Sequence, residues 1–291
     1  MNTSAHAADF LRRQSFIELN ARERANVLVD AGTARELLGP FDRIESPWLA
    51  AQGITPQADD GCVVIKGKIA GQTAVVAALE GAFQGGSIGE VSGAKMTAAL
   101  DLAAQDCERG VPTSAVILLE TGGVRLQEGN LGLAAIAELM NAVLVLGRRA
   151  PVVCLTAGTV GCFGGMALVA GLASYVVMTR EGRLGMNGPE VIQEENGVEE
   201  FDASDRSLIW AIHGGEQRQA LGLVDALVED DVSQIAEAVR ASILKGVPST
   251  HRSSEIDLYR RRIQALDASR QWDPRELRTS WNDQPHTEEK Q

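Results

Sequence analysis

The sequence predicts an α/β fold, and three observations support it. Two runs, SAVILLETGGVRLQEGNLGLAAIAELM (114–140) and PVVCLTAGTVGCFGGMALVAGLA (151–173), each read as a strand, a glycine-bearing turn and a helix. Their strands are apolar without alternation, which indicates burial on both faces of a sheet. The 30 glycines of the 291-residue chain fall mostly at strand–helix junctions, as tight turns between alternating elements require.

Residues 1–59 are predicted to form a helical segment and a connector. A helix over 20–32 begins with the capping-box pair Asn20 and Glu23, and a second short helix follows from Thr33.

Residues 60–245 are predicted to form one α/β domain, because strands and helices alternate there. Its strands are predicted over 62–70, 72–80, 114–119, 151–156, 174–178, 183–186 and 223–228, the first two forming a hairpin. Its helices are predicted over 90–109, 130–146, 165–172, 189–195, 203–212, 215–221 and 232–245. Residues 246–291 are predicted to be a polar C-terminal tail with one short helix that docks on the protein.

Charge and cysteine content exclude several classes of function. The net charge of −12 argues against a broad nucleic-acid surface. The four cysteines lack CxxC spacing, so we expect buried free thiols and no metal site. Glycines and polar residues interrupt the apolar runs before they approach the roughly 20 residues that span a bilayer. We therefore expect no membrane partner and a cytoplasmic location.

Familiar catalytic side-chain motifs are missing from the chain. It contains four histidines and no HExxH, GxSxG or Walker motif, and GTVGCFGG (158–165) does not match the dinucleotide fingerprint GxGxxG. His213 precedes two glycines, so we expect it to end a helix rather than to act as a base.

The two glycine turns instead favour chemistry through an enolate. Glycine lets the main chain approach a ligand closely, and the helix N-terminus that follows offers free N–H groups. Such donors stabilise the negative charge that forms on a thioester oxygen when a malonyl thioester loses CO2, a step that needs no base. The alternative is that these glycines only make tight turns.

Three segments resemble the acyl-CoA carboxyltransferase family, especially the β subunit of acetyl-CoA carboxylase. They are GGSIGEVSGAK (85–95), ETGGVRLQEG (120–129) and LGMNGPEVIQ (184–193), and the resemblance covers about residues 60–230. Within the family, the chain is most similar to the β subunits of biotin-independent malonate decarboxylases. The resemblance implies a crotonase-like superhelix of stacked ββα units.

The resemblance also implies the roles of individual residues. It implies that the main-chain N–H groups of Gly122 and Gly123 bind the oxyanion. It also implies that Gly164 and Gly165 form a second set of main-chain contacts to it. The substrate-binding candidates are Gly85, Gly86, Ser87, Arg125 and Glu128. Two interpretations of Gly85, Gly86 and Ser87 stay open: they line the thioester pocket, or they only form a turn before the helix over 90–109. For Arg125 and Glu128, a local ion pair that fixes the loop is favoured over direct chemistry.

The cofactor and partners follow from the same resemblance. It implies no cofactor bound covalently to this chain and a malonyl group on the CoA-like prosthetic thiol of an acyl carrier protein. It implies a homologous γ subunit and an acyl transferase subunit as further partners. The acidic carrier is expected to dock on one of the two densest clusters of arginine, which are Arg148-Arg149 and the three arginines over 260–262. The alternative is that the γ subunit supplies the basic surface.

Some residues depart from the family pattern, and two other functions stay open. The chain lacks the AMKM motif of biotinyl proteins and a four-cysteine zinc ribbon. Glu120 and Thr121 stand where Ser or Ala usually precedes the glycine pair, and Cys162 and Phe163 precede the second pair. The alternatives are a carboxyltransferase that exchanges the carboxyl group with biotin, and a non-catalytic scaffold subunit.

Overall fold

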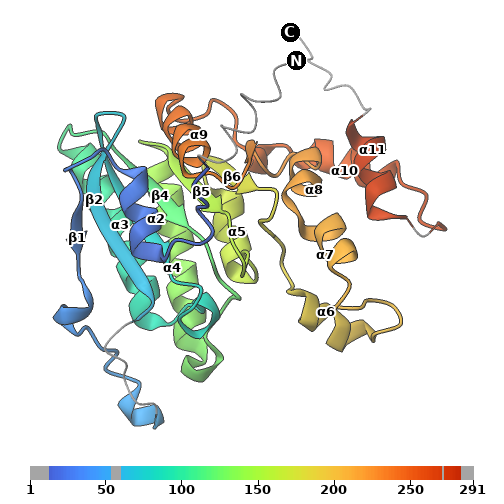
Figure 1. Cartoon of the computed structure of the whole chain (residues 1–291), viewed down its shortest axis with the longest axis horizontal. Helices are drawn as coiled ribbons and strands as arrows, with labels where there is room; N and C mark the ends of the chain where they lie inside the picture. The colour runs from blue at the N-terminus through green and yellow to red at the C-terminus, as the bar shows by residue number, and fades with distance from the viewer. Residues whose placement is uncertain (1–12, 54–59, 271, 283–291) are drawn as a thin grey trace.

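The computed structural model describes residues 13–53, 60–270 and 272–282. Its centre is a seven-stranded sheet with the strands in sequence order (Figure 1). The strands are β1 (Arg35–Leu37), β2 (Cys62–Ile69), β3 (Gln72–Leu79), β4 (Thr113–Leu118), β5 (Val152–Thr156), β6 (Tyr175–Thr179) and β7 (Ala226–Val228). Strands β1 to β3 pair antiparallel, whereas β3 to β7 pair parallel.

The predicted hairpin is confirmed. Strands β2 and β3 are joined at Ala70 and Gly71, with Ile69 opposite Gln72. Both turn residues have positive φ, 52° and 76°. Two-residue turns with this backbone match the twist of the strands they join.

Helices cover both faces of the sheet (Figure 1). The helices are α2 (Ala21–Leu28), α3 (Glu90–Glu108), α4 (Asn130–Gly147), α5 (Gly165–Leu172), α6 (Pro189–Asn196), α7 (Arg206–His213), α8 (Gly215–Ala220), α9 (Val232–Leu244), α10 (Ile256–Gln264) and α11 (Pro274–Asn282). Helices α3, α4 and α5 pack on one face with Val75 and Ile117, and α2 and α9 pack on the other with Val76 and Val116. The predicted burial of both sheet faces is therefore confirmed, as is the crotonase-like α/β fold class.

The C-terminal helices form a separate group beside the sheet, at the right of Figure 1. Helix α11 packs on α7 and α8, which buries Trp281 under the guanidinium of Arg262 at 5.6 Å from the ring centroid. The described part of the tail thus docks on the protein as predicted, but it holds two α-helices, α10 and α11, rather than one.

Three local expectations are wrong. The second short helix expected from Thr33 is strand β1, because pairing with β2 outweighs the local capping signal. Helix α2 has the predicted capping box but ends at Leu28, before Gly32. The strand expected over 183–186 is reduced to isolated bridges that Arg183 and Leu184 make with neighbouring loops.

The expectation that no apolar stretch approaches membrane-spanning length is wrong for α4. Among the described residues, this 18-residue helix is long and apolar enough to cross a membrane by length and composition alone. Packing accounts for part of this apolar character, since Ile136, Leu139, Val143 and Leu146 are buried in the helical layer.

Helices α3 and α4 approach closely at Gly93. A Cβ atom added there would lie 2.5 Å from Cβ of Ala135, whereas one added to Gly171 in α5 would meet no atom within 4 Å. We predict that Gly93→Ala destabilises the fold by about 1–3 kcal/mol through overpacking. The matched change Gly171→Ala should be neutral or stabilising by up to about 1 kcal/mol through helix propensity. Urea denaturation of both variants measures this, and equal stabilities would contradict the close packing.

Candidate active site

The two glycine turns lie side by side at the carboxyl ends of β4 and β5. The N–H of Thr121 donates to the carbonyl of Gly161 at 2.7 Å, and the N–H of Phe163 donates to the carbonyl of Thr121 at 3.0 Å. A Cβ atom added to Gly164 would lie 3.4 Å from Cα of Gly123. The turns therefore touch glycine to glycine, as parallel neighbouring strands allow.

The segment with Gly85, Gly86 and Ser87 lies on the outer side of the first turn. The carbonyl of Gly85 accepts the N–H of Gly122 at 3.0 Å. Gly86 has a φ of 64°, and a Cβ atom there would lie 1.6 Å from the carbonyl oxygen of Glu120. Only glycine fits at this position, so the residue is required for the close contact of the two loops.

The N–H groups of the four predicted catalytic glycines differ in availability. The N–H of Gly122 is taken by Gly85, and that of Gly164 donates to the carbonyl of Met186 at 2.8 Å. Of the acceptors that the structure describes, the N–H of Gly123 meets only the hydroxyl of Thr121, at 3.1 Å. The N–H of Gly165, at the start of α5, has no protein acceptor among the described residues.

Two further N–H groups at these turns were not singled out from the sequence. Within the described part of the chain, the N–H groups of Val124 and Met166 also have no protein acceptor. Free main-chain N–H groups next to a helix N-terminus attract negative charge. The two turns together can therefore stabilise an anionic oxygen with main chain alone.

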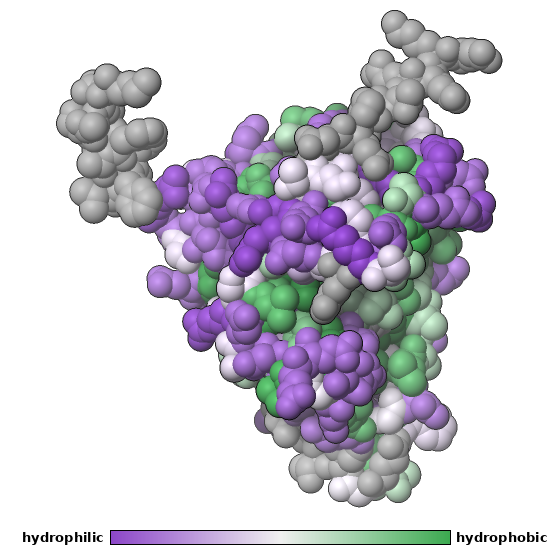
Figure 2. Space-filling view, turned by 90° about the vertical axis from the view of Figure 1, so that its right-hand side faces the viewer, coloured by the Kyte–Doolittle hydropathy of each residue, from purple (hydrophilic) through white to green (hydrophobic). Residues whose placement is uncertain are grey.

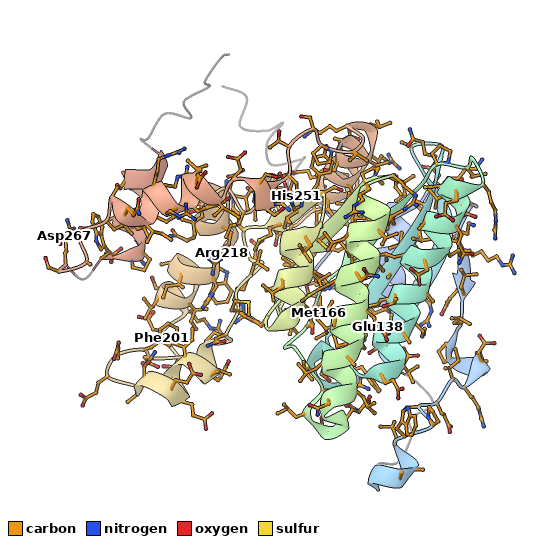
Figure 3. All side chains as sticks on the ribbon, turned by 180° about the vertical axis from the view of Figure 1, so that it is seen from behind. Glu138, Met166, Phe201, Arg218, His251 and Asp267 are labelled. Carbon is orange, nitrogen blue, oxygen red and sulfur yellow. The ribbon has the colours of Figure 1, made fainter. Side chains whose placement is uncertain are left out.

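An apolar hollow opens beside the second turn. It has a volume of about 660 Å³ and lies between α4, α5 and the segment that carries Met186. Leu168, Leu172 and Leu184 line it, and Arg218 contributes a charged wall. In Figure 3, Arg218 lies between α5 and the C-terminal helices.

Arg125 and Glu128 form the local ion pair favoured from the sequence. The Nη1 of Arg125 donates to Oε1 of Glu128 at 2.8 Å, and both side chains are buried. The other carboxylate oxygen accepts the N–H of Glu90 at the start of α3. Arg125 also donates to the hydroxyl and the carbonyl of Ser87. The pair therefore ties the first turn to α3 and to the segment before it, and its role in substrate binding stays a prediction.

The sequence analysis did not predict that the side chain of Glu120 contacts the second glycine turn. Its carboxylate lies beneath the second turn and accepts N–H groups of Ala157, Val160 and Gly161. Burial raises the pKa of this carboxyl, while Arg24 and the three N–H groups oppose the rise. The one available signal was that an acidic residue stands where relatives carry Ser or Ala.

The cysteines are free thiols, as predicted, and three of the four are buried. Burial raises the pKa of Cys154 to about 12 and that of Cys162 well above its ordinary value. These two thiols therefore stay protonated and are poor nucleophiles. The described residues contain no group of three or more His, Cys, Asp or Glu that could hold a metal ion.

His213 ends α7, as predicted, and is held neutral. Because a guanidinium can only donate, the contact of Arg218 Nη2 with Nδ1 of His213 at 3.1 Å places the proton on Nε2. That Nε2–H has no partner among the described residues. Burial and the nearby charge of Arg218 lower the pKa of His213 to about 4.

We predict that His213 makes the fold less stable in mild acid. Its pKa falls from 6.5 to about 4 on folding, so only the unfolded chain takes up the proton between these values. Stability is fully present above pH 6.5 and should drop by roughly 2 kcal/mol on going to about pH 5. His213→Asn keeps an acceptor near Nδ1 but does not titrate, so urea midpoints of this variant should change less with pH. Parallel pH dependences of the two proteins would contradict the lowered pKa.

Comparison with known proteins agrees with this geometry. The family model of the carboxyl transferase domain matches residues 18–291. The chain is 42% identical over 261 residues to the malonyl-S-ACP:biotin-protein carboxyltransferase MADC of Malonomonas rubra, covering 86% of this chain and 80% of the relative.

Two solved structures are also similar. One is a chain of a Pseudomonas malonate decarboxylase hetero-tetramer in complex with malonate, with a TM-score of 0.89, 56% identity, and coverage of 94% of this chain and 99% of that chain. The other is a chain of the Pseudomonas MdcD-MdcE hetero-dimer, with a TM-score of 0.74, 51% identity, and coverage of 88% and 98%. The chain belongs to the carboxyl transferase family, and within it to the malonate decarboxylase subunits and their carboxyltransferase relatives.

Proposed function

We propose that the chain is the catalytic β subunit of a malonate decarboxylase that releases CO2 from a malonyl thioester on an acyl carrier protein. The observation that carries the proposal is the set of N–H groups left available where the two glycine turns touch. Among the described residues, those of Gly165, Val124 and Met166 have no protein acceptor, and that of Gly123 meets only a hydroxyl. The similarity to the Pseudomonas malonate decarboxylase chains supports the choice of substrate.

In the proposed reaction the bond between the carboxylate and the α carbon breaks. Its electron pair moves toward the thioester carbonyl, CO2 leaves, and the oxygen becomes negatively charged. The N–H groups of Gly123 and Gly165 are the proposed donors to that oxygen, with Val124 and Met166 beside them. Gly122 and Gly164 hold the turns through their bonds to Gly85 and Met186. A proton then adds to the α carbon and gives the acetyl thioester.

The side chains near the turns are consistent with a reaction that needs no base. Cys162 stays protonated and is a poor nucleophile, and the lowered pKa of His213, about 4, makes its neutral imidazole a weak base. Decarboxylation provides its own electron pair, and its barrier falls mainly through stabilisation of the oxyanion.

The proposal includes a homologous γ subunit as partner, together with the carrier and an acyl transferase subunit. No described element covers the face formed by α4 and α5 in Figure 3. Exposed apolar side chains are available on α4 (Leu133 and Leu144), on α5 (Leu168) and in the loop beside α5 (Met186). On the face seen in Figure 2, apolar surface gathers in the middle and along the right-hand edge, within a mostly hydrophilic surface. Apolar patches of this kind mark subunit contacts.

The basic clusters considered for carrier docking are largely neutralised. Arg260 pairs with Asp257 at 2.9 Å, and Arg149 pairs with Glu108 at 3.0 Å. Arg262 is buried and stacks on Trp281. We therefore favour the γ subunit as the source of the basic surface that meets the carrier.

Carboxyl transfer to biotin is the second candidate, because the Malonomonas relative is named for it. Both reactions pass through the same enolate. Purified chain with its γ partner and malonyl-carrier distinguishes them, since biotin-independent CO2 release supports decarboxylation and avidin-sensitive turnover supports transfer. A scaffold role predicts that turnover survives loss of the donors in this chain.

We predict that Gly165→Pro lowers turnover about 100-fold, because it removes one oxyanion donor. Proline is tolerated at the first position of a helix, where the N–H has no helical acceptor. Gly165→Ala is the matched control, since it adds the same Cβ, 3.0 Å from Ile136, but keeps the N–H. A substitution at Gly123 would test the oxyanion role less cleanly, because its φ of 115° strains any side chain. Equal turnover of the Pro and Ala variants would exclude Gly165 as a donor.

We predict that Leu168→Asp weakens association with the γ subunit at least tenfold, because a charge would lose water at an apolar contact. Leu244→Asp, on α9 at the opposite face of the sheet, is the control and should leave association unchanged. Both leucines are about half exposed, at 48% and 60%, so neither change should unfold the chain. Light scattering and titration calorimetry of the two chains measure the effect, and an unaffected Leu168 variant would move the interface elsewhere.

A further inference from the structure

Glu120 connects the two glycine turns through its side chain. The residue belongs to the first turn, and its carboxylate accepts N–H groups of the second: Ala157 at 3.3 Å, Val160 at 3.1 Å and Gly161 at 3.4 Å. Its exposed fraction is 3%, so water does not compete for these bonds. The loop over 157–161 is thus folded around an internal anion, in the way that a nest of N–H groups surrounds a bound one.

The surrounding loops leave room for this carboxylate and for little else. A Cβ atom added to Gly158 would lie 2.3 Å from Oε1 of Glu120, and one added to Gly81 would lie 3.4 Å from Cβ of Glu120. The carbonyl of the same residue is the atom that excludes a side chain from Gly86. Glu120 therefore contacts the segment over 81–86 as well as the second turn.

A counter-ion for Glu120 comes from the N-terminal segment. Nη1 of Arg24, in α2, lies 3.5 Å from Oε1 of Glu120. The same guanidinium donates to the carbonyls of Phe16 and Ile17, so its position is fixed by its own segment. Arg24 is also buried. A buried charge pair contributes little net stability, and the best-attested reason to keep one is that it selects one arrangement of the chain.

We propose that Glu120 is a positioning residue for the reaction: it holds the donors of the two turns at the spacing that the enolate oxygen requires, and Arg24 supports its charged form. The inference rests on the proposed function. Glu120 lies three residues before Gly123, and Gly161 lies four residues before Gly165. Among the described residues, the other hydrogen bonds between the two turns are main-chain bonds of Thr121, with Gly161 and with Phe163. Without the carboxylate, three N–H groups lose their acceptor and the second turn can shift against the first.

The main test is Glu120→Gln in the complex of this chain with its γ subunit. The amide side chain has one acceptor oxygen where the carboxylate has two, and it loses the attraction to Arg24. We expect kcat for CO2 release to fall at least tenfold, with KM for malonyl-carrier changed less than threefold. Glu120→Asp keeps the charge and should retain more of kcat than Glu120→Gln.

Asp106→Asn is the matched control. Asp106 is buried and pairs with Lys66 at 2.5 Å, but it lies beside Thr113 at the start of β4, at the end of the strand opposite the turns. It undergoes the same change from carboxylate to amide, so it reports the cost of losing a buried charge alone. We expect its melting temperature to fall while its kcat stays within twofold of the wild-type value.

Amide hydrogen exchange provides a readout that does not depend on activity. We expect Glu120→Gln to lose protection over 157–166 at least tenfold more than Asp106→Asn does.

If Glu120→Gln does not fold, Arg24→Met removes the counter-ion instead and should change kcat and exchange in the same direction. A kcat within twofold of wild type, or unchanged protection over 157–166, would overturn the positioning role. Wild-type complex that releases no CO2 would refute the proposed function, and the exchange measurement would still decide the role of Glu120.

Discussion

The contact between Gly123 and Gly164 is the constraint on which the candidate site depends. Parallel pairing of β4 and β5 brings the turns after these strands to the same edge of the sheet. A Cβ atom on either glycine would lie in van der Waals contact with the other turn, and the positive φ of both residues, 115° and 65°, strains any side chain there. Because both positions lack side chains, the main chains of two separate loops can face one small region from two directions.

Buried charges inside the protein organise these loops. Glu128 caps the start of α3 and pairs with Arg125, and Glu120 gathers the N–H groups of the second turn. Each carboxylate satisfies donors that would otherwise be unpaired in the interior, where an unsatisfied group is costly. The anions that shape the site are thus behind the turns, which leaves uncharged N–H groups to meet the substrate in the proposed reaction.

The sequence predicted most elements because their signals are local. The strand–glycine–helix order of 151–173 and the capping box at Asn20 depend on neighbouring residues, and both are confirmed. Strand β1 was missed because its partner, β2, begins 25 residues after it ends. The contacts of Glu120 were missed for the same reason, because its carboxylate accepts hydrogen bonds from N–H groups that are 37 to 41 residues further along the chain. The sequence also could not show which glycine N–H groups are already hydrogen-bonded within the protein. The N–H of Gly122 donates to Gly85, whereas that of Gly165 has no acceptor among the described residues.

Decarboxylation and carboxyl transfer make the same demand on the glycine turns. In both, negative charge gathers on one thioester oxygen, and donors preorganised for that oxygen lower either barrier equally. Selectivity between the two must therefore come from groups that face the departing CO2 rather than the oxygen. The open side of the turns, toward Met186 and the exposed face of α5, is where a partner subunit can supply such groups. A single fold can thus serve both of the candidate reactions, with the groups around the departing CO2 deciding whether it is captured or released.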